Sequence, residues 1–283
     1  MNISIIICNH RKSRIPIFKH NILSYIGDVD YELIIVDNSE NKYSIFEAYN
    51  IGATKSEGEF LLFLHDDIEF RTHKFGEIFL SLDLPYLGVL GIAGSKLKTS
   101  VPSPWWISNH EQVPNGILFQ SNIQHCSNTK PQIINLGFTY ENQIEEVILV
   151  DGVLLFTTKE NYLINPFDEN YSSFHFYDLD YSLGMKKNGK INYVTNTILL
   201  EHFSSGSLNK DWIEASFKYE KKWNKCVGLI EVTDNHFEIL AFESRVQILL
   251  QNRFYLKTIQ LLFHYKYITI KLFRVILKSI FRG

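Results

Sequence analysis

The chain has 283 residues, of which 45% are apolar and 21% are charged, a composition typical of a globular protein with a substantial hydrophobic core. The net charge is −3, and three widely spaced cysteines (Cys8, Cys126 and Cys226) exclude a disulfide framework or a CxxC zinc site and favour a reducing compartment. Neither a membrane span nor a signal peptide is expected, because the uncharged apolar runs are too short and no cleavage site follows the first of them.

Three short apolar runs occur in the first quarter of the chain. They span residues 3–8, 31–37 and 59–65. Because their apolar residues are continuous and do not alternate with polar ones, they predict parallel strands that are covered on both faces of a sheet.

The segments between these runs show apolar residues at helical spacing. In residues 13–27, Gly27 is placed to end the helix. The next helix begins at an S-x-x-E capping box formed by Ser44 and Glu47, and we expect Gly58 to end it. The alternation of strands and helices predicts a doubly wound α/β sheet.

Polar side chains follow each of these strands, in residues 8–11, 37–39 and 65–67. In doubly wound sheets, ligands bind outside the carboxyl ends of the strands, so we expect the three groups to converge on one site. His65, Asp66 and Asp67 are of residue types that bind metals. The sequence therefore predicts a divalent-cation site at the end of the third strand.

The rest of the chain continues the mixed pattern. We expect helices at 74–82, 174–189 and 207–223, strands at 87–93, within 145–160 and at 190–196, and helical structure over the last forty residues. Residues 95–147 are rich in Pro, Asn, Ser and Gln, which predicts long irregular structure on the rim of the sheet and no separate domain.

Five motifs stand in a characteristic order along this chain. They are IIVDNSE (34–40), YNIGATKSEGEFLLFLHDDI (49–68), VDG (150–152), FDENYSSFHFYDLDYSL (167–183) and EHFSSGS (201–207). Together they resemble the family 2 glycosyltransferases with the GT-A fold, and more narrowly a bacterial subgroup with an H-x-D metal motif and an H-F-Y-D-x-D acidic motif. The resemblance covers roughly residues 1–225. It implies a Rossmann-like, doubly wound, mostly parallel sheet with helices on both faces.

This resemblance also implies an activity. Family members of this kind are metal-dependent hexosyl- or related transferases, here expected to be inverting. The donor is a nucleotide-diphosphate sugar, with UDP favoured, and the acceptor is a saccharide, a lipid-linked sugar or a protein glycan. Mn²⁺ or Mg²⁺ stabilises the charge that develops on the departing diphosphate. Bacterial surface polysaccharide or glycoconjugate synthesis is the expected setting.

The resemblance assigns the metal to two residues. Asp67 is the principal ligand, and His202 completes the metal shell, since imidazole binds Mn²⁺ readily. Most relatives carry Asp where this chain has His65. The role of His65 is therefore open between the nucleotide ribose, the metal and neither. Asp66 either contacts the ribose or binds the metal through water.

Other residues are assigned to the donor by the same resemblance. Asp37 accepts a hydrogen bond from the nucleotide base, and Asn38 shapes the turn beside it. The position of Arg11 after the first strand suits a contact with the base or the diphosphate. Gly152 permits a close approach of the backbone to a sugar, and Asp151 binds a sugar hydroxyl.

The general base is expected among two aspartates of the predicted helix at 174–189. Asp178 and Asp180 are about 200° apart around a helix, so they cannot both face one pocket. Asp180 lies close to the apolar stripe of Phe176, Leu179 and Leu183, which favours a structural role. Asp178 lies nearly opposite that stripe and matches the family position of the base, so we expect Asp178 to be catalytic.

The C-terminal segment differs in charge from the rest of the chain. Residues 244–283 carry eight Lys or Arg and no Asp or Glu, which leaves 20 basic and 31 acidic residues before them. We expect a catalytic domain at 1–225 and a helical extension at 226–283, which binds an anionic membrane surface or a second subunit of a homo-oligomer. The acidic body argues against nucleic acid. The expected location is cytoplasmic, with the inner face of the cell membrane as a possible site.

Two other functions are compatible with a fold of this kind. A nucleotidyltransferase of similar fold needs a glycine-rich phosphate loop after the first strand, and residues 8–15 contain no glycine. A non-catalytic sugar-nucleotide-binding or scaffold protein of the same fold is the alternative, and the presence of Asp67, Asp178 and His202 argues against it.

Overall fold

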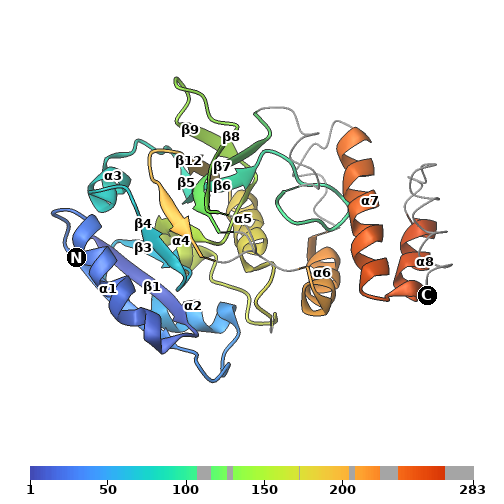
Figure 1. The fold of residues 1–283 in the computed structure, drawn as a ribbon, viewed down its shortest axis with the longest axis horizontal. Helices are drawn as coiled ribbons and strands as arrows, with labels where there is room; N and C mark the ends of the chain where they lie inside the picture. The colour runs from blue at the N-terminus through green and yellow to red at the C-terminus, as the bar shows by residue number, and fades with distance from the viewer. Residues whose placement is uncertain (107–115, 126–129, 172, 204–207, 224–234, 265–283) are drawn as a thin grey trace. The chain divides into compact units, whose positions relative to one another are not determined.

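The computed structural model describes residues 1–106, 116–125, 130–171, 173–203, 208–223 and 235–264 (Figure 1). The chain forms two compact units. The first consists of Met1–Leu97 and Pro114–Gly206, and the second of Lys98–Val113 and Ser207–Gly283. Cys8 is a buried free thiol, whereas Cys126 and Cys226 lie outside the described residues.

The three apolar runs form parallel strands, as predicted. These strands are β1 (Ile3–Asn9), β2 (Tyr31–Asp37) and β3 (Phe60–Leu64). β1 lies between the other two, and its register places Asn9 opposite Asp37. The carboxyl ends of the three strands therefore lie along one edge of the sheet, and the polar residues that follow them emerge there.

Helices cover both faces of this sheet (Figure 1). They include α1 (Ile15–Tyr25), α2 (Ile45–Lys55), α3 (Phe75–Ser81), α4 (Lys159–Ile164) and α5 (Tyr177–Lys187). Side chains of β1 alternate between the faces. Ile5 packs in the same core as Phe18 of α1, whereas Ile6 meets α2 so closely that a Cβ added to Gly52 would lie 2.3 Å from it.

The first sheet has seven strands in the order β2-β1-β3-β11-β5-β12-β9. Its further strands are β5 (Leu87–Gly91), β9 (Ile144–Val147), β11 (Leu154–Thr158) and β12 (Ile191–Thr195). β11 is antiparallel to β3 and β5, whereas β5 and β12 are parallel. The predicted α/β fold class is confirmed, in a sheet that mixes parallel pairs with antiparallel ones.

The structure contains a second sheet, which the sequence patterns do not predict. Its six strands follow the order β10-β6-β7-β13-β4, with β8 paired to β7. They are β4 (Ile68–Phe70), β6 (Ala93–Ser95), β7 (Leu118–Gln124), β8 (Gln132–Leu136), β10 (Leu149–Val150) and β13 (Leu200–His202). The prediction of irregular structure over 95–147 is therefore wrong for β7 and β8. These strands are short or polar, and they gain their stability from pairing with distant segments.

Helix α2 begins as predicted but ends earlier. The hydroxyl of Ser44 accepts a hydrogen bond from the backbone of Glu47, whose side chain accepts in return from the Ser44 N–H at 2.7 Å. The helix ends at Lys55, and Ser56 is already extended. The prediction that Gly58 ends the helix is therefore wrong. Gly58 passes close to β1, where an added Cβ would lie 2.7 Å from the backbone nitrogen of Ser4.

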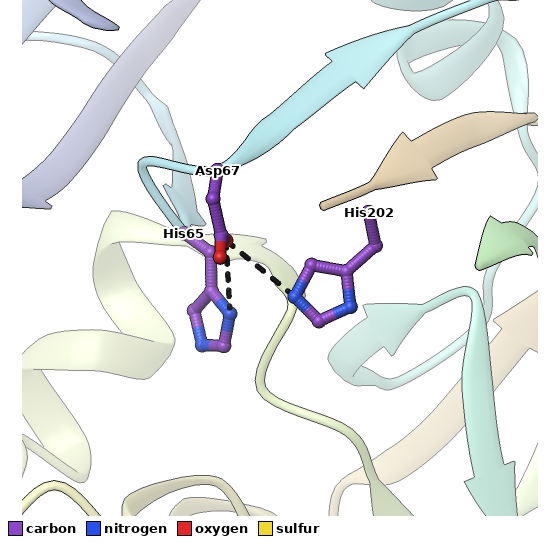
Figure 2. Close-up of side chains that lie close together, drawn as sticks. All are labelled: His65, Asp67 and His202. Atoms are coloured by element: carbon purple, nitrogen blue, oxygen red, sulfur yellow. Dashed lines mark ion pairs between the residues drawn. The ribbon is translucent and has the colours of Figure 1, made fainter. Parts of the chain in front are cut away.

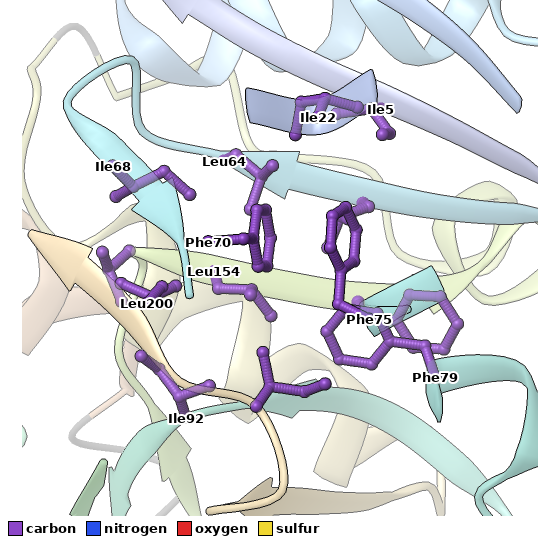
Figure 3. Packing of buried hydrophobic residues seen from close by; sticks show 14 of the residues in the cluster. Ile5, Ile22, Leu64, Ile68, Phe70, Phe75, Phe79, Ile92, Leu154 and Leu200 are labelled. Carbon is purple, nitrogen blue, oxygen red and sulfur yellow. The ribbon is translucent and has the colours of Figure 1, made fainter. Parts of the chain in front are cut away.

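One hydrophobic core anchors the strands that carry the polar edge (Figure 3). Leu64 at the end of β3 and Ile68 at the start of β4 are both fully buried in it. The rings of Phe70 and Phe75 stack with their centroids 3.7 Å apart. Because both flanks of the turn at 65–67 are packed in this core, the turn is held in a defined position.

The second unit contains three helices among its described residues, α6 (Lys210–Trp223), α7 (Asn235–Gln251) and α8 (Tyr255–His264). Within it, the fully buried guanidinium of Arg245 lies 5.2 Å from the ring centroid of Trp212 and 4.9 Å from that of Phe217. Arg253, with a φ of 63°, separates α7 from α8, so the predicted tail helix is broken there. The remainder of that prediction, at 265–283, lies outside the described residues.

In the part of the chain that the structure describes, no helix combines the length and apolarity that crossing a membrane requires.

Candidate metal and donor site

The turn between β3 and β4 meets the end of β13, because β13 pairs with β4. His202 stands opposite Ile68 in this pairing, and the backbone N–H of Phe203 donates to the carbonyl oxygen of Asp67 at 2.9 Å. As a result, Nε2 of His202 lies 3.5 Å from Oδ1 of Asp67, and Nδ1 of His65 lies 3.8 Å from the same oxygen (Figure 2). The fold thus joins two distant motifs at one point.

Among the described residues, His65, Asp67 and His202 form a group of side chains that can hold a metal ion. One ligand atom from each lies within 4.8 Å of the other two. Mg²⁺ prefers oxygen ligands, whereas two imidazole nitrogens with a carboxylate oxygen are a ligand set for divalent transition-metal ions. These three residues therefore fit a divalent cation. His65 lies in the same group as Asp67 and His202, the two residues that were expected to bind the cation.

The surroundings of the His65 imidazole favour its neutral form. Burial, and then the proximity of His202, lower the pKa of His65. Its Nε2 lies 2.7 Å from the hydroxyl oxygen of Tyr177. Neutral imidazole is the form that binds metals, so these surroundings suit His65 to that task.

Asp66 has different surroundings from Asp67. Its Oδ2 accepts hydrogen bonds from the backbone N–H of His10 at 2.8 Å and of Arg11 at 3.3 Å. A further hydrogen bond comes from the side-chain amide of Asn9 at 3.3 Å. Asp66 is buried and therefore fastens the turn at the end of β3 to the end of β1.

Arg11 bridges the two aspartates. Its Nη2 lies 3.4 Å from Oδ1 of Asp66 and 3.2 Å from Oδ2 of Asp67. The Arg11 side chain is nevertheless 49% exposed. A half-exposed positive charge consequently lies beside the metal-ligand group, where it can meet an anionic ligand.

Asp37 and Asn38 lie at the carboxyl end of β2, and among the described residues neither forms a hydrogen bond or ion pair with the metal-ligand group. Asn38 is buried and exchanges hydrogen bonds of 2.8 and 2.9 Å with the backbone of Tyr43. Asp37 is exposed, and hydrogen bonds from Ser39, together with Lys12 at 3.0 Å, lower the pKa of Asp37 to about 2. Asp37 is therefore a carboxylate open to solvent, and Asn38 shapes the turn beside it.

The absence of a side chain at Gly152 leaves room for the hydroxyl group of Tyr177. A Cβ added to Gly152 would lie 2.0 Å from the hydroxyl oxygen of Tyr177. That hydroxyl donates to the carbonyl oxygen of Gly152 at 2.9 Å. The group that closely approaches the backbone of Gly152 is thus the Tyr177 side chain, whereas a sugar was expected there. The neighbouring Asp151 accepts a hydrogen bond from the backbone of Val153 at 2.9 Å.

Asp178 stands at the start of α5, directly after Tyr177. Its carboxylate accepts hydrogen bonds from the backbone of Gly152 at 3.0 Å and of Leu179 at 2.9 Å. Burial, and then the charge of Asp151, raise the pKa of Asp178 to about 7. Asp178 is half-buried, whereas Asp180 is 5% exposed. A carboxyl group with a pKa near 7 is suited to exchange a proton.

The backbone before Asp178 is constrained. Phe176 adopts a left-handed conformation with a φ of 68°, although it is not a glycine and is buried. Such a conformation costs about 1–3 kcal/mol and persists only where its surroundings enforce it. It sets the direction in which α5 begins, and therefore the positions of Tyr177 and Asp178.

Two residues beside the metal-ligand group were missed by sequence reasoning. Tyr177 contacts His65 at 2.7 Å, and the side-chain oxygen of Gln124 lies 3.3 Å from Nδ1 of His202. Tyr177 belongs to the H-F-Y-D motif, so its position next to Asp178 was a usable signal. Gln124 had none, since it lies on a strand that was expected to be irregular.

The chain was compared with protein-family models, curated proteins and solved structures. Residues 4–227 match a family model described as "Glycosyltransferase like family". No curated protein matches the chain at a significant level. Among solved structures, the chain is similar to the crystal structure of GalNAc-T7 with UDP, GalNAc and Mn²⁺, with 11% sequence identity and a TM-score of 0.48. That alignment covers 85% of this chain and 53% of the other, so this chain spans about half the length of that structure. Because the family model covers most of its length, the chain belongs to the glycosyltransferase-like family.

Proposed function

We propose that the chain is a metal-dependent glycosyltransferase that moves a sugar from a nucleotide-diphosphate donor to an acceptor hydroxyl. The observation that carries this proposal is the grouping of His65, Asp67 and His202 within 4.8 Å in a chain of the glycosyltransferase-like family. Asp178 supports it further, because His65 contacts Tyr177, the residue that precedes Asp178.

The metal is held by His65, Asp67 and His202, with Mn²⁺ favoured by the two imidazole nitrogens. When bound, the cation supplies Lewis-acid stabilisation of the charge on the departing diphosphate. Arg11, half-exposed and 3.2 Å from Asp67, adds a second positive charge for the same phosphate groups. Asp66 holds this arrangement together through its hydrogen bonds to the backbone after β1.

Asp178 acts as the general base. As the acceptor oxygen forms its bond to the anomeric carbon, the hydroxyl proton passes to the Asp178 carboxylate and the bond to the diphosphate breaks. With a pKa of about 7, a large fraction of Asp178 is deprotonated near neutral pH and still basic enough to take the proton. A base on the acceptor side corresponds to direct displacement, so the reaction inverts the anomeric configuration.

The donor is a UDP-sugar, whose base is bound by Asp37 at the exposed edge of β2, beside the turn that Asn38 shapes. Asp151 binds a hydroxyl of one of the two sugars. Gly152 contributes to the donor site indirectly, because it leaves room for the hydroxyl group of Tyr177. The acceptor is a saccharide, free or carried by a lipid or a protein.

The setting is the synthesis of bacterial surface polysaccharide or glycoconjugate, at the inner face of the membrane. The catalytic domain spans 1–225, and the extension at 226–283 binds anionic lipid. Helix α8 supports this, because Leu256 and Phe263, which are 79% and 85% exposed, lie on one face with Ile259. The surrounding sequence is basic and lacks acidic residues from 244 onward.

A thermal-shift screen tests the proposal. UDP-, GDP- and dTDP-sugars are added with and without MnCl₂, and we expect a UDP-sugar with Mn²⁺ to raise the Tm most. Asp67→Asn abolishes the dependence on Mn²⁺, whereas Asp83→Asn, at an exposed position, leaves it unchanged. The donor-site proposal fails if no nucleotide sugar raises the Tm of the unsubstituted protein under either condition. Binding without release of UDP in the presence of acceptor favours the non-catalytic alternative.

A further inference from the structure

The hydrogen bonds of Tyr177 determine which nitrogen of His65 carries the proton. A hydroxyl has one hydrogen, and the Tyr177 hydroxyl donates it to the carbonyl oxygen of Gly152, which can only accept, at 2.9 Å. Towards His65 the same oxygen must therefore accept, from Nε2 at 2.7 Å. Neutral His65 consequently carries its proton on Nε2 and its lone pair on Nδ1, the nitrogen near Asp67.

A separate set of contacts determines the tautomer of His202. The amide nitrogen of Gln124 donates to the backbone carbonyl of His125 at 3.4 Å, which fixes the orientation of the Gln124 amide. Its oxygen accepts from Asn122 at 3.0 Å and faces Nδ1 of His202 at 3.3 Å. That contact requires a proton on Nδ1, so in the neutral ring Nε2 carries the lone pair. Nε2 is the nitrogen that lies 3.5 Å from Asp67.

The two histidines direct different ring nitrogens, Nδ1 of His65 and Nε2 of His202, at the same carboxylate oxygen of Asp67 (Figure 2). In the tautomers derived above, these are the two nitrogens that carry the lone pairs. In the other tautomer, either ring would direct an N–H into that space and exclude a cation. We propose that Tyr177 and Gln124 are positioning residues that fix the tautomers of His65 and His202, so that the metal-ligand group is preorganised before a metal arrives. This inference rests on the proposed metal site.

The roles of two further residues follow. Gly152 belongs to the arrangement, because a Cβ at this position would displace the Tyr177 hydroxyl. Asn122 supports Gln124 through the row of amides on β7, in which Gln120 donates to Asn122 at 2.9 Å. Residues that orient metal-binding histidines typically change the metal affinity by about 10–100-fold when they are removed.

The first test reads the tautomers directly, in metal-free protein. Long-range ¹H–¹⁵N correlations of ¹⁵N-histidine-labelled protein, assigned by substituting each histidine, distinguish a protonated from an unprotonated ring nitrogen. We expect the proton on Nε2 of His65 and on Nδ1 of His202. The opposite tautomer at either residue in the unsubstituted protein overturns the inference, whether or not the protein binds metal.

The second test measures the dissociation constant of Mn²⁺ by electron paramagnetic resonance. Tyr177→Phe removes only the hydroxyl, and Gln124→Leu removes the amide. We expect each to weaken Mn²⁺ binding about 10–100-fold and to change the tautomer of its own histidine. Gln124→Glu keeps an acceptor oxygen, so it retains the Nδ1–H tautomer and restores binding. Tyr140→Phe, at a residue 97% exposed, and Gln143→Leu, also at an exposed residue, are matched controls.

The outcomes separate this inference from the proposed function. If the unsubstituted protein binds Mn²⁺ and Tyr177→Phe and Gln124→Leu bind it equally well, the inference is wrong and the metal site stands. If the unsubstituted protein binds no Mn²⁺ although its tautomers are as expected, the proposed metal site is wrong. The proposed role of the tautomers in preparing that site is then wrong as well. A folded variant that loses affinity with its tautomer unchanged also contradicts the inference.

Discussion

Two aspartates in one helical turn have different surroundings. Asp180 is buried among the neighbours of α5, whereas Asp178 is half-buried and receives hydrogen bonds from Gly152 and Leu179. The difference follows from the geometry of the helix, because residues two positions apart in the sequence lie on nearly opposite sides of the helix axis. Burial, and then the charge of Asp151, raise the pKa of Asp178 to about 7.

Replacement of the proposed base is expected to remove turnover and leave binding intact. Asp178→Asn keeps an oxygen for the backbone N–H groups but cannot take a proton, so we expect kcat to fall about 10²–10⁴-fold. The dissociation constants of Mn²⁺ and of the donor are expected to stay within about threefold. Steady-state kinetics and calorimetric titration measure these quantities, with Asp83→Asn as the exposed control. Turnover at the unsubstituted rate would contradict the assignment.

The reaction should depend on pH through the same group. Because the pKa of Asp178 is raised to about 7, its basic form is lost as the pH falls, and kcat/KM is expected to decrease about tenfold per unit well below pH 7. Asp151→Asn removes the neighbouring negative charge while keeping an oxygen for Val153, so the midpoint moves to lower pH. A pH–rate profile measures both, and an unchanged midpoint in Asp151→Asn argues against this cause.

Asp178 also links stability to pH. Its pKa in the folded protein is raised above the ordinary value of 3.8, so the folded state favours the protonated form. The corresponding stabilisation is fully present below about pH 4 and is lost as the pH rises through about 7. In Asp178→Asn this contribution disappears. Urea denaturation at several pH values is expected to show a smaller decline between pH 5 and 8 than in the unsubstituted protein.

Gly152 offers a stereochemical test of the site. Gly152→Ala places a methyl group against the Tyr177 hydroxyl and is expected to cost about 1–3 kcal/mol of unfolding free energy and to weaken Mn²⁺ binding. Gly58→Ala makes a similar clash with the backbone of Ser4, at the amino end of β1. It should therefore destabilise the protein without changing the metal affinity of the folded fraction. Equal loss of Mn²⁺ affinity in both variants would show that the effect is general destabilisation.

At the scale of elements, strong local patterns were predictive and short non-local strands were not. β1, β2 and β3 are continuous apolar runs, and α2 begins with a capping box. Each of these elements can therefore be predicted from a few consecutive residues. β6 has three residues and β10 has two, and both are defined by pairing with distant segments. No local window contains that information.

The candidate site shows the same division. Motif order marks His65, Asp67, Asp178 and His202 as candidates, whereas no local pattern marks Gln124, which the pairing of β7 with β13 brings beside His202. Glycines were identified as special positions, but their partners were not. Gly58 approaches β1 and Gly152 accommodates Tyr177, and both relations require the folded chain.

The capping box of α2 provides a prediction at this scale. Ser44→Ala leaves the backbone N–H of Glu47 without its side-chain acceptor, and we expect a loss of about 1 kcal/mol in the free energy of unfolding. Ser44→Asp retains an acceptor and should recover most of it. Chemical denaturation measures both. An unchanged midpoint for Ser44→Ala would mean that tertiary packing alone fixes the start of α2.

At the scale of the whole molecule, charge is segregated along the sequence. The segment after residue 243 carries only basic charges, whereas the preceding part is acidic. The predicted boundary after residue 225 remains a proposal, and the compact units are those of Met1–Leu97 with Pro114–Gly206 and of Lys98–Val113 with Ser207–Gly283. Exposed apolar side chains of α8 lie within the basic segment.

Binding to lipid vesicles tests the proposed membrane surface. We expect the protein to sediment with vesicles that contain phosphatidylglycerol but not with those of phosphatidylcholine alone, and to be released at high salt, since charge and apolar contact act together. Phe263→Glu should reduce this binding, whereas Leu163→Glu, at an exposed position on α4, should not. Concentration-dependent self-association without lipid binding would instead identify the extension as a subunit interface.

The pairing of β13 with β4 has a thermodynamic consequence. Because the backbone of Phe203 is bonded to Asp67 and His202 ends the paired strand, local opening of this strand and dispersal of the three ligands are one event. An ion that binds only the assembled ligands must then oppose that opening by mass action. Amide hydrogen exchange at the end of β13 should consequently slow as Mn²⁺ is added, so that the rigidity of this sheet reports how fully the ligand group is occupied.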